Sequence, residues 1–341
     1  MSPQYTVLVT GSSGHLGTAL ILSLPSLGHV PLGIDILPSP TTSITGSITD
    51  LPLLVSILTS HPTITHIIHA ATLHKPHVAS HPKPSFIETN ISGTQALLDA
   101  AASILPRLKS FIFISTTSTF GSALSPRPGS PASWIDESVT PIPKNIYGVT
   151  KTAAEDLCRL AHIQTSLPVV VLRTSRFFPE SDDDPARRAA LTDANLKVCE
   201  LAHRRVDIAD VVSTVVCAME RAGEIGWGKY VISAPTPFVK DAETLRRLGT
   251  GDAASMLREA VPGCEAVFEK LGWGMMDRID RVYDSSLAVK ELGWKPEWTI
   301  DKVVEKLARG EDWRSELTHR VGKKGYHAVP TGVYTTEARS A

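Results

Sequence analysis

Two residues near the middle of the chain have the types and spacing needed for proton transfer. Tyr147 and Lys151 stand four positions apart in the segment YGVTK, and residues at that spacing share a face when the segment is helical. A free tyrosine has a pKa of about 10, and a neighbouring ammonium favours its phenolate, so Tyr147 would become a usable acid or base. The same spacing also occurs in ordinary surface pairs on helices. Taken by themselves, these two residues do not exclude that interpretation.

A glycine-rich turn near the start of the sequence could hold a phosphate. The segment TGSSGHLG lies between an apolar run at 5–9 that predicts a strand and a run at 18–22 that predicts a helix. Glycines in such a turn let the backbone approach a pyrophosphate, which then meets free N–H groups at the helix start. The residues expected to contact a dinucleotide here are Gly11, Ser13, Gly14, His15, Leu16 and Gly17.

An acidic residue indicates which dinucleotide is preferred. Asp35 ends the next strand-like run, at the distance expected for a carboxylate that binds a ribose. A carboxylate there accepts hydrogen bonds from the ribose diol and repels a 2′-phosphate, and no Arg or Lys follows in 36–38. The sequence therefore predicts NAD, with NADP disfavoured; the alternative is a surface aspartate at a strand end.

A run of hydroxyl residues follows a third buried strand. The continuous apolar run 111–114 predicts a strand of a parallel sheet, and Ser115 to Thr119 come directly after it. Because ligands in open α/β sheets bind at the carboxyl ends of strands, some of these hydroxyls should face a substrate. Most of them could equally cap the next turn.

In this order the motifs resemble those of the extended short-chain dehydrogenase/reductase family, of the NAD-dependent epimerase/dehydratase type. The resemblance covers about residues 5 to 308 and includes VDIADVV at 206–212 and LGWKP at 292–296. It is specific for the family and says little about the substrate. The other matching positions are the glycine turn, Asp35, Asp50, the HAA segment at 69–71, the NISGT segment at 90–94, Phe120-Gly121, Tyr147 and Lys151.

The resemblance assigns roles to single residues. Tyr147 would be the acid/base, Lys151 would bind the nicotinamide ribose and lower the pKa of the tyrosine, and Thr116 would hydrogen-bond the reacting oxygen. On the cofactor side, the resemblance implies that Asp50 holds the adenine, that the backbone of Ala70 and Ala71 lines the cofactor, and that Asn90, also counted with the cofactor site, buttresses the catalytic helix. Asn90 could also be a helix cap.

Departures from the family pattern narrow the chemistry. Where sugar-nucleotide dehydratases of the family carry two carboxyl residues, this chain has Thr117 and Ser118. Neither hydroxyl is a strong acid at neutral pH, so dehydration is disfavoured. The segment 180–205 is short for a nucleotide-sugar pocket, which favours a smaller substrate. Arg176 stands where an Asn commonly meets substrate, so it would bind an anionic group or pair with the acidic run 182–184.

Histidines are concentrated between 61 and 81. His74 and His77 follow a predicted strand at the active-site edge, so His74 is a candidate substrate contact along with Thr117 and Arg176; solvated loop histidines are the alternative. A metal site is not expected, because the pair lacks two further ligands and Pro76 breaks the helix that would align them.

The composition is that of a globular enzyme. The chain has 341 residues, 42% of them hydrophobic, and a formal net charge of −1, which indicates no nucleic-acid partner. Four widely spaced cysteines favour reduced thiols in the cytoplasm, the first strand begins too early for a signal peptide, and no apolar run is long enough to span a membrane.

Alternating strand and helix signals predict an α/β fold, a Rossmann-like doubly wound parallel sheet with a small, abbreviated C-terminal substrate-binding region. We expect a dinucleotide-binding core at 1–175 with the catalytic helix, an interleaved substrate region at 176–312 and a tail at 313–341 that folds back or frays. The stretch 122–145, with five prolines, predicts a long loop beside the substrate, and 207–222 and 284–292 predict helices.

Three functions remain open. The first is an NAD-dependent oxidoreductase acting on a secondary alcohol or ketone of a small, possibly anionic or carbohydrate-like substrate. The second is a redox-neutral sugar or nucleotide-sugar epimerase that keeps NAD bound, and the third, opposed by the intact triad, is a dinucleotide sensor. The family resemblance implies a homodimer through the Tyr147 helix and the helix before strand five, although burial within one subunit would give the same apolar pattern.

Overall fold

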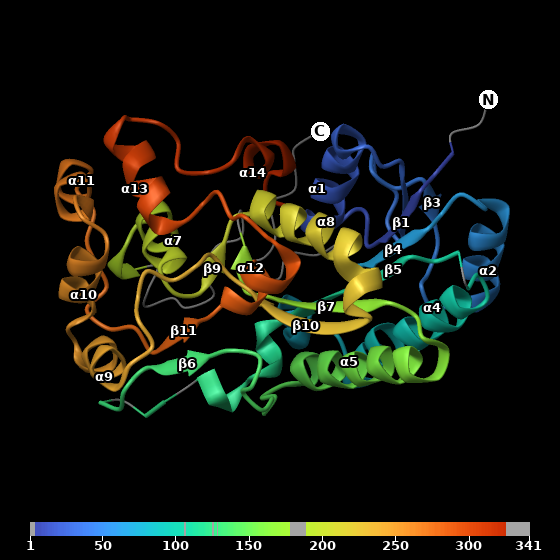
Figure 1. The fold of residues 1–341 in the computed structure, drawn as a ribbon, viewed down its shortest axis with the longest axis horizontal. Coiled ribbons are helices and arrows are strands. Elements are labelled where there is room, and N and C mark those ends of the chain that lie inside the picture. Colours follow the sequence, from blue (N-terminus) through green and yellow to red (C-terminus); the bar gives the residue numbers. More distant parts are fainter. Residues whose placement is uncertain (1–3, 106, 125, 128, 178–188, 325–341) are drawn as a thin grey trace.

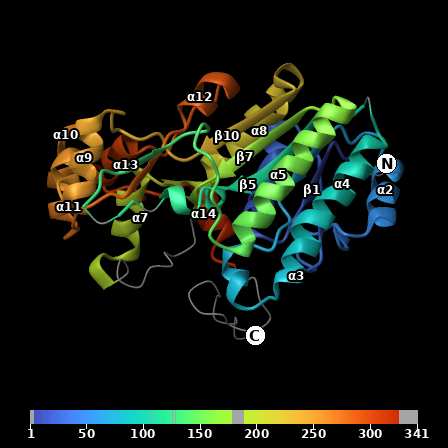
Figure 2. The ribbon, with the colours of Figure 1, turned by 90° about the horizontal axis from the view of Figure 1, so that it is seen from below.

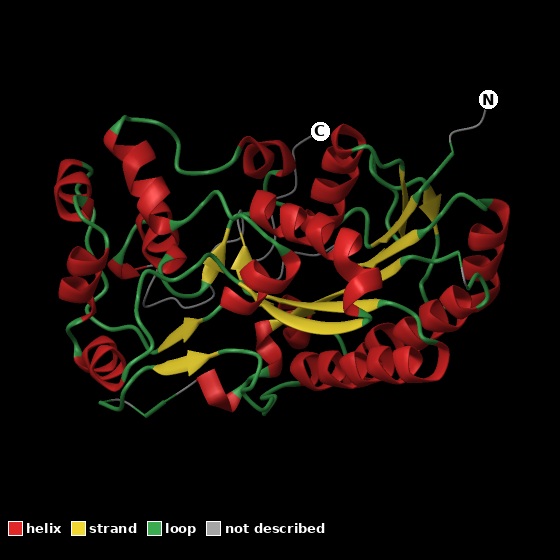
Figure 3. Ribbon diagram, viewed as in Figure 1, coloured by secondary structure: helices red, strands yellow, loops and turns green. Residues whose placement is uncertain are grey.

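The computed structural model describes residues 4–105, 107–124, 126–127, 129–177 and 189–324. Its centre is a seven-stranded sheet in which every paired neighbour runs parallel (Figures 1 and 3), as predicted for a doubly wound fold. In spatial order the strands are β10 (Trp227–Ile232), β7 (Val169–Thr174), β5 (Ser110–Thr116), β4 (His66–His69), β1 (Val7–Thr10), β2 (Pro31–Asp35) and β3 (Ile44–Thr45).

Successive residues of each strand point into two separate cores. In β1, Val7 and Val9 pack on one side of the sheet and Leu8 on the other, and all three are fully buried. This alternation follows from the period of two in a strand, and burial on both faces explains why the strands are continuous apolar runs. One face is covered by α1 (His15–Ser23), α8 (Ile208–Ile225) and α12 (Ser286–Leu292), the other by α2 (Leu51–Ser60), α4 (Gly93–Ala102) and α5 (Ile146–Thr165).

The order of the strands creates a crevice at the centre of the sheet. β1 pairs with β2 on one side and with β4 on the other. The chain therefore runs from β1 through β2 to β3 at one edge of the sheet, and then crosses back to form β4 on the other side of β1. Ligands of such sheets bind outside the carboxyl ends of the strands at this reversal point. The structure therefore places the glycine turn after β1 at the expected binding position.

A second group of elements lies away from the sheet, at the left of Figure 1, and has its own apolar core. Part of this group was expected to be a loop: residues 122–145 contain β6, which pairs in parallel with β11, a strand about 150 residues later in the chain. The prediction of an irregular stretch was wrong here because the partner strand is remote in sequence. The elements are β6 (Ser133–Ile135), β11 (Arg281–Tyr283), α7 (Asp193–Leu201), α9 (Ala242–Thr250), α10 (Ala253–Ala260), α11 (Cys264–Lys270) and α13 (Ile300–Ala308). A further parallel pair, β8 (Arg176–Phe177) and β9 (Arg205–Val206), contributes Phe177 and Val206 to a core of the main sheet.

Two helices after the central sheet strands agree with the predicted ones to within a few residues. The helix expected at 207–222 is α8, and the one expected at 284–292 is α12. Figure 2 shows α4 and α5 running beside each other on one face of the sheet. The remaining short elements are η1 (Leu24–Leu27), η2 (Lys75–Ala79), α3 (Lys83–Phe86), η3 (Ile87–Ser92), η4 (Thr117–Thr119), η5 (Ser122–Leu124) and α14 (Glu316–Val321).

Candidate active site

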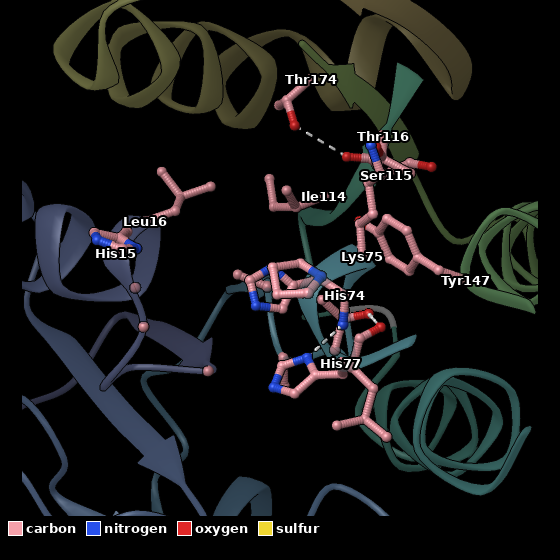
Figure 4. Close-up of a pocket in the computed structure, with 18 of the residues that line it drawn as sticks. His15, Leu16, His74, Lys75, His77, Ile114, Ser115, Thr116, Tyr147 and Thr174 are labelled. Carbon is pink, nitrogen blue, oxygen red and sulfur yellow. Dashed lines mark hydrogen bonds between the residues drawn. The ribbon is translucent and has the colours of Figure 1, made fainter. Parts of the chain in front are cut away.

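One cavity of about 480 Å³ runs along the carboxyl ends of β1, β4, β5 and β7. Figure 4 shows His15 and Leu16 on one side of it and Thr116 and Tyr147 on the other. The two sequence motifs, which are far apart in the chain, thus share one cavity. Of the residues predicted to contact cofactor or substrate, the following line it: Gly11, Ser13, Gly14, His15, Leu16, Gly17, Asp35, Ala70, Ala71, His74, Thr116, Thr117, Tyr147 and Arg176.

The glycine turn is packed so closely that side chains are excluded. Gly11 has a φ of +73°, and a Cβ atom there would lie 2.7 Å from the backbone N of Ala71. A Cβ atom at Gly17 would lie 1.9 Å from the carbonyl oxygen of Gly11. Both contacts are far too short for real atoms, so these positions require glycine. The first turn of α1 stays close to β1, with its N–H groups available for a pyrophosphate.

Asp35 is held against the glycine turn. Its Oδ2 accepts a hydrogen bond from the Ser13 backbone N at 3.0 Å, and its Oδ1 accepts one from the Leu37 backbone N at 2.9 Å. These bonds fix the carboxylate at the end of β2, where it lines the cavity. Its position and charge fit the ribose diol of the adenosine half of NAD.

Asp50 lies outside the cavity and has a different local role. Its side chain caps α2 by accepting a hydrogen bond from the Leu53 backbone N at 3.0 Å. The cavity wall in this region is formed by Ser47 and Ile48 instead. An Asp before a helix is a strong capping signal; the contact of Asp50 with the adenine stays a prediction.

Asn90 is a buttress and does not line the cavity. Its side-chain amide donates to the Leu73 carbonyl oxygen at 2.9 Å and to Thr150 Oγ1 at 3.0 Å, and its Oδ1 accepts from the Leu73 backbone N at 2.8 Å. Only 2% of the residue is exposed. Asn90 thus ties the loop after β4 to the helix that carries Tyr147, which is the buttressing role expected from the resemblance.

Tyr147 and Thr116 meet at the end of β5. Asn145 caps α5 by accepting a hydrogen bond from the Gly148 backbone N at 2.9 Å, which starts the helix directly before the tyrosine. Thr116 ends the strand, and its Oγ1 accepts a hydrogen bond from the Ser118 backbone N at 3.1 Å. Thr116 therefore serves as a turn cap and lines the cavity as well.

Lys151 is fully buried behind the same strand end. Its Nζ donates to the Ile114 carbonyl oxygen at 2.7 Å and lies 3.9 Å from the ring centre of Phe113. Burial lowers the pKa of Lys151 to about 7, against a smaller opposing effect from Glu155. The lysine is not part of the cavity wall, and Ile114 lies between the two. Its charge is thus poorly solvated, and the residue lies one turn after Tyr147 in α5.

The substrate end of the cavity is richer in cations than the sequence suggested. Besides the predicted Arg176, the wall contains Lys75, Arg204 and Arg281. Arg281 comes from β11, which pairs with β6 and is also bonded to the residue before Arg204, since His203 Nδ1 donates to the Arg281 carbonyl oxygen at 3.0 Å. These three residues belong to no local motif. Because they lie far apart in the sequence, no spacing pattern predicts that they line one cavity.

The rings of His74 and His77 lie tilted against each other at the cavity wall, with centres 4.5 Å apart and an interplanar angle of 54°. His77 Nδ1 accepts a hydrogen bond from the His74 backbone N at 2.9 Å. In the described part of the chain, no group of three His, Cys, Asp or Glu side chains is arranged to hold a metal ion.

None of the described helices is long and apolar enough to cross a membrane. The acidic run 182–184, considered as a partner for Arg176, lies outside the described residues.

Solved structures with the same fold include nucleotide-sugar enzymes. A short-chain dehydrogenase/reductase superfamily protein from Agrobacterium tumefaciens with bound NAD matches with a TM-score of 0.61 and 20% identity, covering 89% of this chain and 96% of that one. UDP-glucose 4-epimerase from Brucella ovis in complex with NAD matches with a TM-score of 0.59 and 21% identity, covering 90% and 98%. At these identities the matches establish the fold alone.

Curated relatives match over part or nearly all of the chain. A UDP-glucose 4-epimerase of Rhizobium leguminosarum bv. trifolii is 31% identical over 49% of this chain and 50% of its own length. A dTDP-glucose 4,6-dehydratase of Streptomyces antibioticus is 27% identical over 90% and 91%. The chain spans 50 to 59% of the length of the first three curated relatives it matches.

A family model supplies the most direct comparison. It matches residues 7–232, which contain the glycine turn, Asp35, Thr116, Tyr147 and Lys151, and extends through β10 at the sheet edge. Together with the parallel sheet and the shared cavity, this match identifies the chain as a member of the NAD dependent epimerase/dehydratase family.

Proposed function

We propose that the protein is an NAD-dependent oxidoreductase that transfers a hydride at a secondary alcohol or ketone carbon of a small, anionic, carbohydrate-like substrate. The observation that carries the proposal is the shared cavity: Thr116 and Tyr147 line the same space as the glycine turn and Asp35. A dinucleotide held at the turn and a hydroxyl held at Thr116 would therefore be neighbours. The family match supports the same chemistry and cofactor.

In the oxidation direction, Tyr147 would act as the base. Its phenolic oxygen takes the proton of the substrate hydroxyl as the C–H bond breaks, and Thr116 Oγ1 orients that oxygen. NAD, when bound, supplies the hydride acceptor. Burial lowers the pKa of Lys151 to about 7, and in its protonated form the buried ammonium would favour the phenolate. In the reverse direction the same phenol returns the proton.

The charges of the cavity support an anionic substrate. Among the described residues that line the cavity, the one carboxylate is Asp35, on the cofactor side. The cations Lys75, Arg176, Arg204 and Arg281 line the other part. Some of this charge is balanced by nearby acids, since Arg204 pairs with Glu200 and Arg281 with Asp280. A phosphate or carboxylate on the substrate would bind among these cations.

Replacing Lys75 or Arg176 with Met tests this charge argument. Each change should raise the KM of an acidic or phosphorylated sugar about tenfold, with little effect on a matched neutral sugar. Arg309→Met, at an exposed position directly after α13, is the control. Equal losses for neutral and acidic sugars would show that the cations do not select charge.

The hydroxyl residues after β5 argue against dehydration. Thr117 and Ser118 line the cavity at positions where related dehydratases carry acids. Without a second acid or base beside Tyr147, a bound sugar can be oxidised and reduced, but water is not readily expelled from it. An assay with a nucleotide-linked hexose should detect no dehydrated product.

A redox-neutral epimerase is the second candidate, because curated relatives include UDP-glucose 4-epimerases. The same tyrosine and threonine would serve both reactions. The decisive experiment is mass analysis and absorbance of the purified protein, followed by incubation with added NAD and candidate sugars. Turnover of added NAD supports the oxidoreductase; retained NAD with sugar isomerisation and no net NADH would replace it with the epimerase.

We also propose a homodimer that forms through α4 and α5. Val149, Leu160 and Ile163 are 49%, 46% and 67% exposed along α5, and α4 lies beside it (Figure 2). An exposed apolar stripe on paired helices is typical of an isologous interface. Light scattering should give the mass of two chains, and Leu160→Glu with Ile163→Glu should give the mass of one.

A reducing compartment such as the cytoplasm is supported by the four cysteines, which are all free thiols in the structure. Three of them, Cys158, Cys199 and Cys264, are buried, and disulfides are rare where thiols are kept reduced. Thiol titration of the freshly purified, denatured protein should find all four groups reactive.

A further inference from the structure

The C-terminal part of the described chain returns to the cofactor end of the sheet. α14 packs against α1 and α8, and Figure 1 shows it beside both. Asp207, the cap of α8, anchors this segment: its carboxylate accepts hydrogen bonds from Ser315 N at 3.1 Å, Ser315 Oγ at 2.6 Å and Thr318 Oγ1 at 3.0 Å. Val321 then joins the core beneath α1. The positions of residues 322–324 are thereby fixed.

Lys324 lies directly behind the glycine turn. Its backbone N donates to His15 Nε2 at 3.0 Å, and its Nζ donates to the Ser13 carbonyl oxygen at 3.0 Å and to Thr18 Oγ1 at 2.5 Å. Because Ser13 N binds Asp35, the same residue is held from both sides. A residue from the far end of the sequence thus fastens the turn that is expected to cradle the pyrophosphate.

The ammonium of Lys324 lies near the N-terminus of α1, which is the unfavourable end of a helix for a cation. The N-terminus of a helix carries a partial positive charge that repels cations, and the first turn of α1 contains no acidic residue to offset it. Partial burial lowers the pKa of Lys324, opposed by Asp35. Burial and the nearby lysine also lower the pKa of His15 to about 3, so His15 is neutral. An ammonium at this place is stabilised once a phosphate binds at the turn.

We propose that Lys324 is a positioning residue for the dinucleotide: its ammonium strengthens binding of the diphosphate, and binding in turn stabilises the docked segment 315–324. Lys324 is not part of the cavity wall, so it acts through its charge and through its hold on Ser13 and His15. The inference rests on the proposed function only in taking a dinucleotide as the ligand.

The experiment compares a charged with an uncharged ligand in the full-length protein. Calorimetry measures the Kd of ADP-ribose, which carries the diphosphate, and of adenosine, which does not. Lys324→Met should weaken ADP-ribose binding about five- to tenfold and change adenosine binding less than about twofold. Lys324→Arg should restore most of the ADP-ribose affinity, and the loss should shrink at high salt. Lys323→Met, at the adjacent exposed residue, is the matched control.

Each outcome decides the proposal. Equal ADP-ribose affinity in Lys324→Met and Lys323→Met overturns it, while leaving the proposed function intact. Equal losses of ADP-ribose and adenosine also overturn it, because they indicate a damaged turn and no role for the charge. Wild-type protein that binds neither ADP-ribose nor NAD overturns the proposed function together with this inference.

Hydrogen exchange supplies the second readout, independent of catalysis. If binding and docking are coupled, ADP-ribose must slow amide exchange in residues 315–324 of the wild type, since coupling is reciprocal. The same ligand at saturating concentration should protect this segment less in Lys324→Met. Unchanged protection in the variant contradicts the coupling.

Discussion

Glu155 and Arg173 form a buried ion pair beneath the reactive end of the sheet, with Arg173 Nη2 2.7 Å from Glu155 Oε2. Glu155 lies one turn after Lys151 in α5, and its Oε1 also accepts a hydrogen bond from Ser115 Oγ at 2.6 Å. Ser115 is the neighbour of Thr116 in β5, and Arg173 belongs to β7. The pair therefore locks the helix that carries Tyr147 and Lys151 to the strand that carries Thr116.

Removing the charge of Glu155 should destabilise the protein strongly. Glu155→Gln leaves Arg173 buried without its countercharge, and we expect the free energy of unfolding to fall by about 3 kcal/mol. Urea denaturation measures this change. Adding Arg173→Met to Glu155→Gln should recover at least half of the loss, because the uncompensated charge is then gone; a double variant no more stable than the single one would contradict this account.

Tyr147→Phe should abolish the chemical step and spare cofactor binding. The change removes one oxygen at the cavity wall, and loss of an acid/base group costs about a thousandfold in rate. We expect kcat to fall by this factor while the Kd for NAD stays within about twofold of the wild-type value. Steady-state kinetics and calorimetry check the two parts, and a variant with most of its activity would refute the role of the phenol.

Asp35→Asn should reduce the preference for NAD. The asparagine keeps the size of the side chain but removes the negative charge that faces a 2′-phosphate, so the ratio of the Kd values for NADP and NAD should fall at least about tenfold. Asp50→Asn is the control, since Asp50 caps α2 outside the cavity. Wild-type protein that binds both dinucleotides equally would show that Asp35 does not discriminate between them.

Lys151→Met should change how stability depends on pH. Burial lowers the pKa of Lys151 to about 7, so between about pH 7 and 10.5 the unfolded chain binds a proton that the folded protein does not, and stability rises with pH. The methionine variant lacks this contribution. Its stability relative to wild type should therefore decrease by about 2 kcal/mol from pH 7 to pH 9, as measured by urea denaturation.

The exposed lysine Lys83 provides the control for this measurement, because Lys83→Met removes a charge that is already solvated. Its stability difference from wild type should be the same at both pH values. A flat difference for Lys151→Met as well would mean that the buried lysine stays protonated in the folded protein throughout this range.

Local spacing explains the features that sequence analysis could predict. The glycine turn, Asp35 and the Tyr147–Lys151 pair each lie within or beside one strand or helix, where side-chain direction follows from the period of that element. The parallel order of the strands then brings their carboxyl ends together. Asp50, Asn90 and Lys151 were also predicted to contact the cofactor but do not line the cavity. Asp50 caps α2 and Asn90 bonds to α5, and their contact with the cofactor stays a prediction.

Residues that reach the cavity through remote pairing could not be predicted in this way. Arg281 lies in β11, which is held by β6 and by His203, both remote from it in the sequence, and Arg204 and Lys75 belong to no pattern with a fixed spacing. Lys324 reaches the glycine turn because Asp207 anchors the segment before it. Such contacts form between elements that are far apart in the chain.

The sequence by itself determined the sheet, the family, the dinucleotide turn and the acid/base pair. Each of these depends on short-range patterns, and the periods of strands and helices convert such patterns directly into side-chain positions. The tertiary structure alone decided which cations surround the substrate end, how Glu155 and Arg173 lock α5 to β5 and β7, and which lysine stands behind the turn. Those relationships depend on packing between distant segments, and no local spacing encodes them.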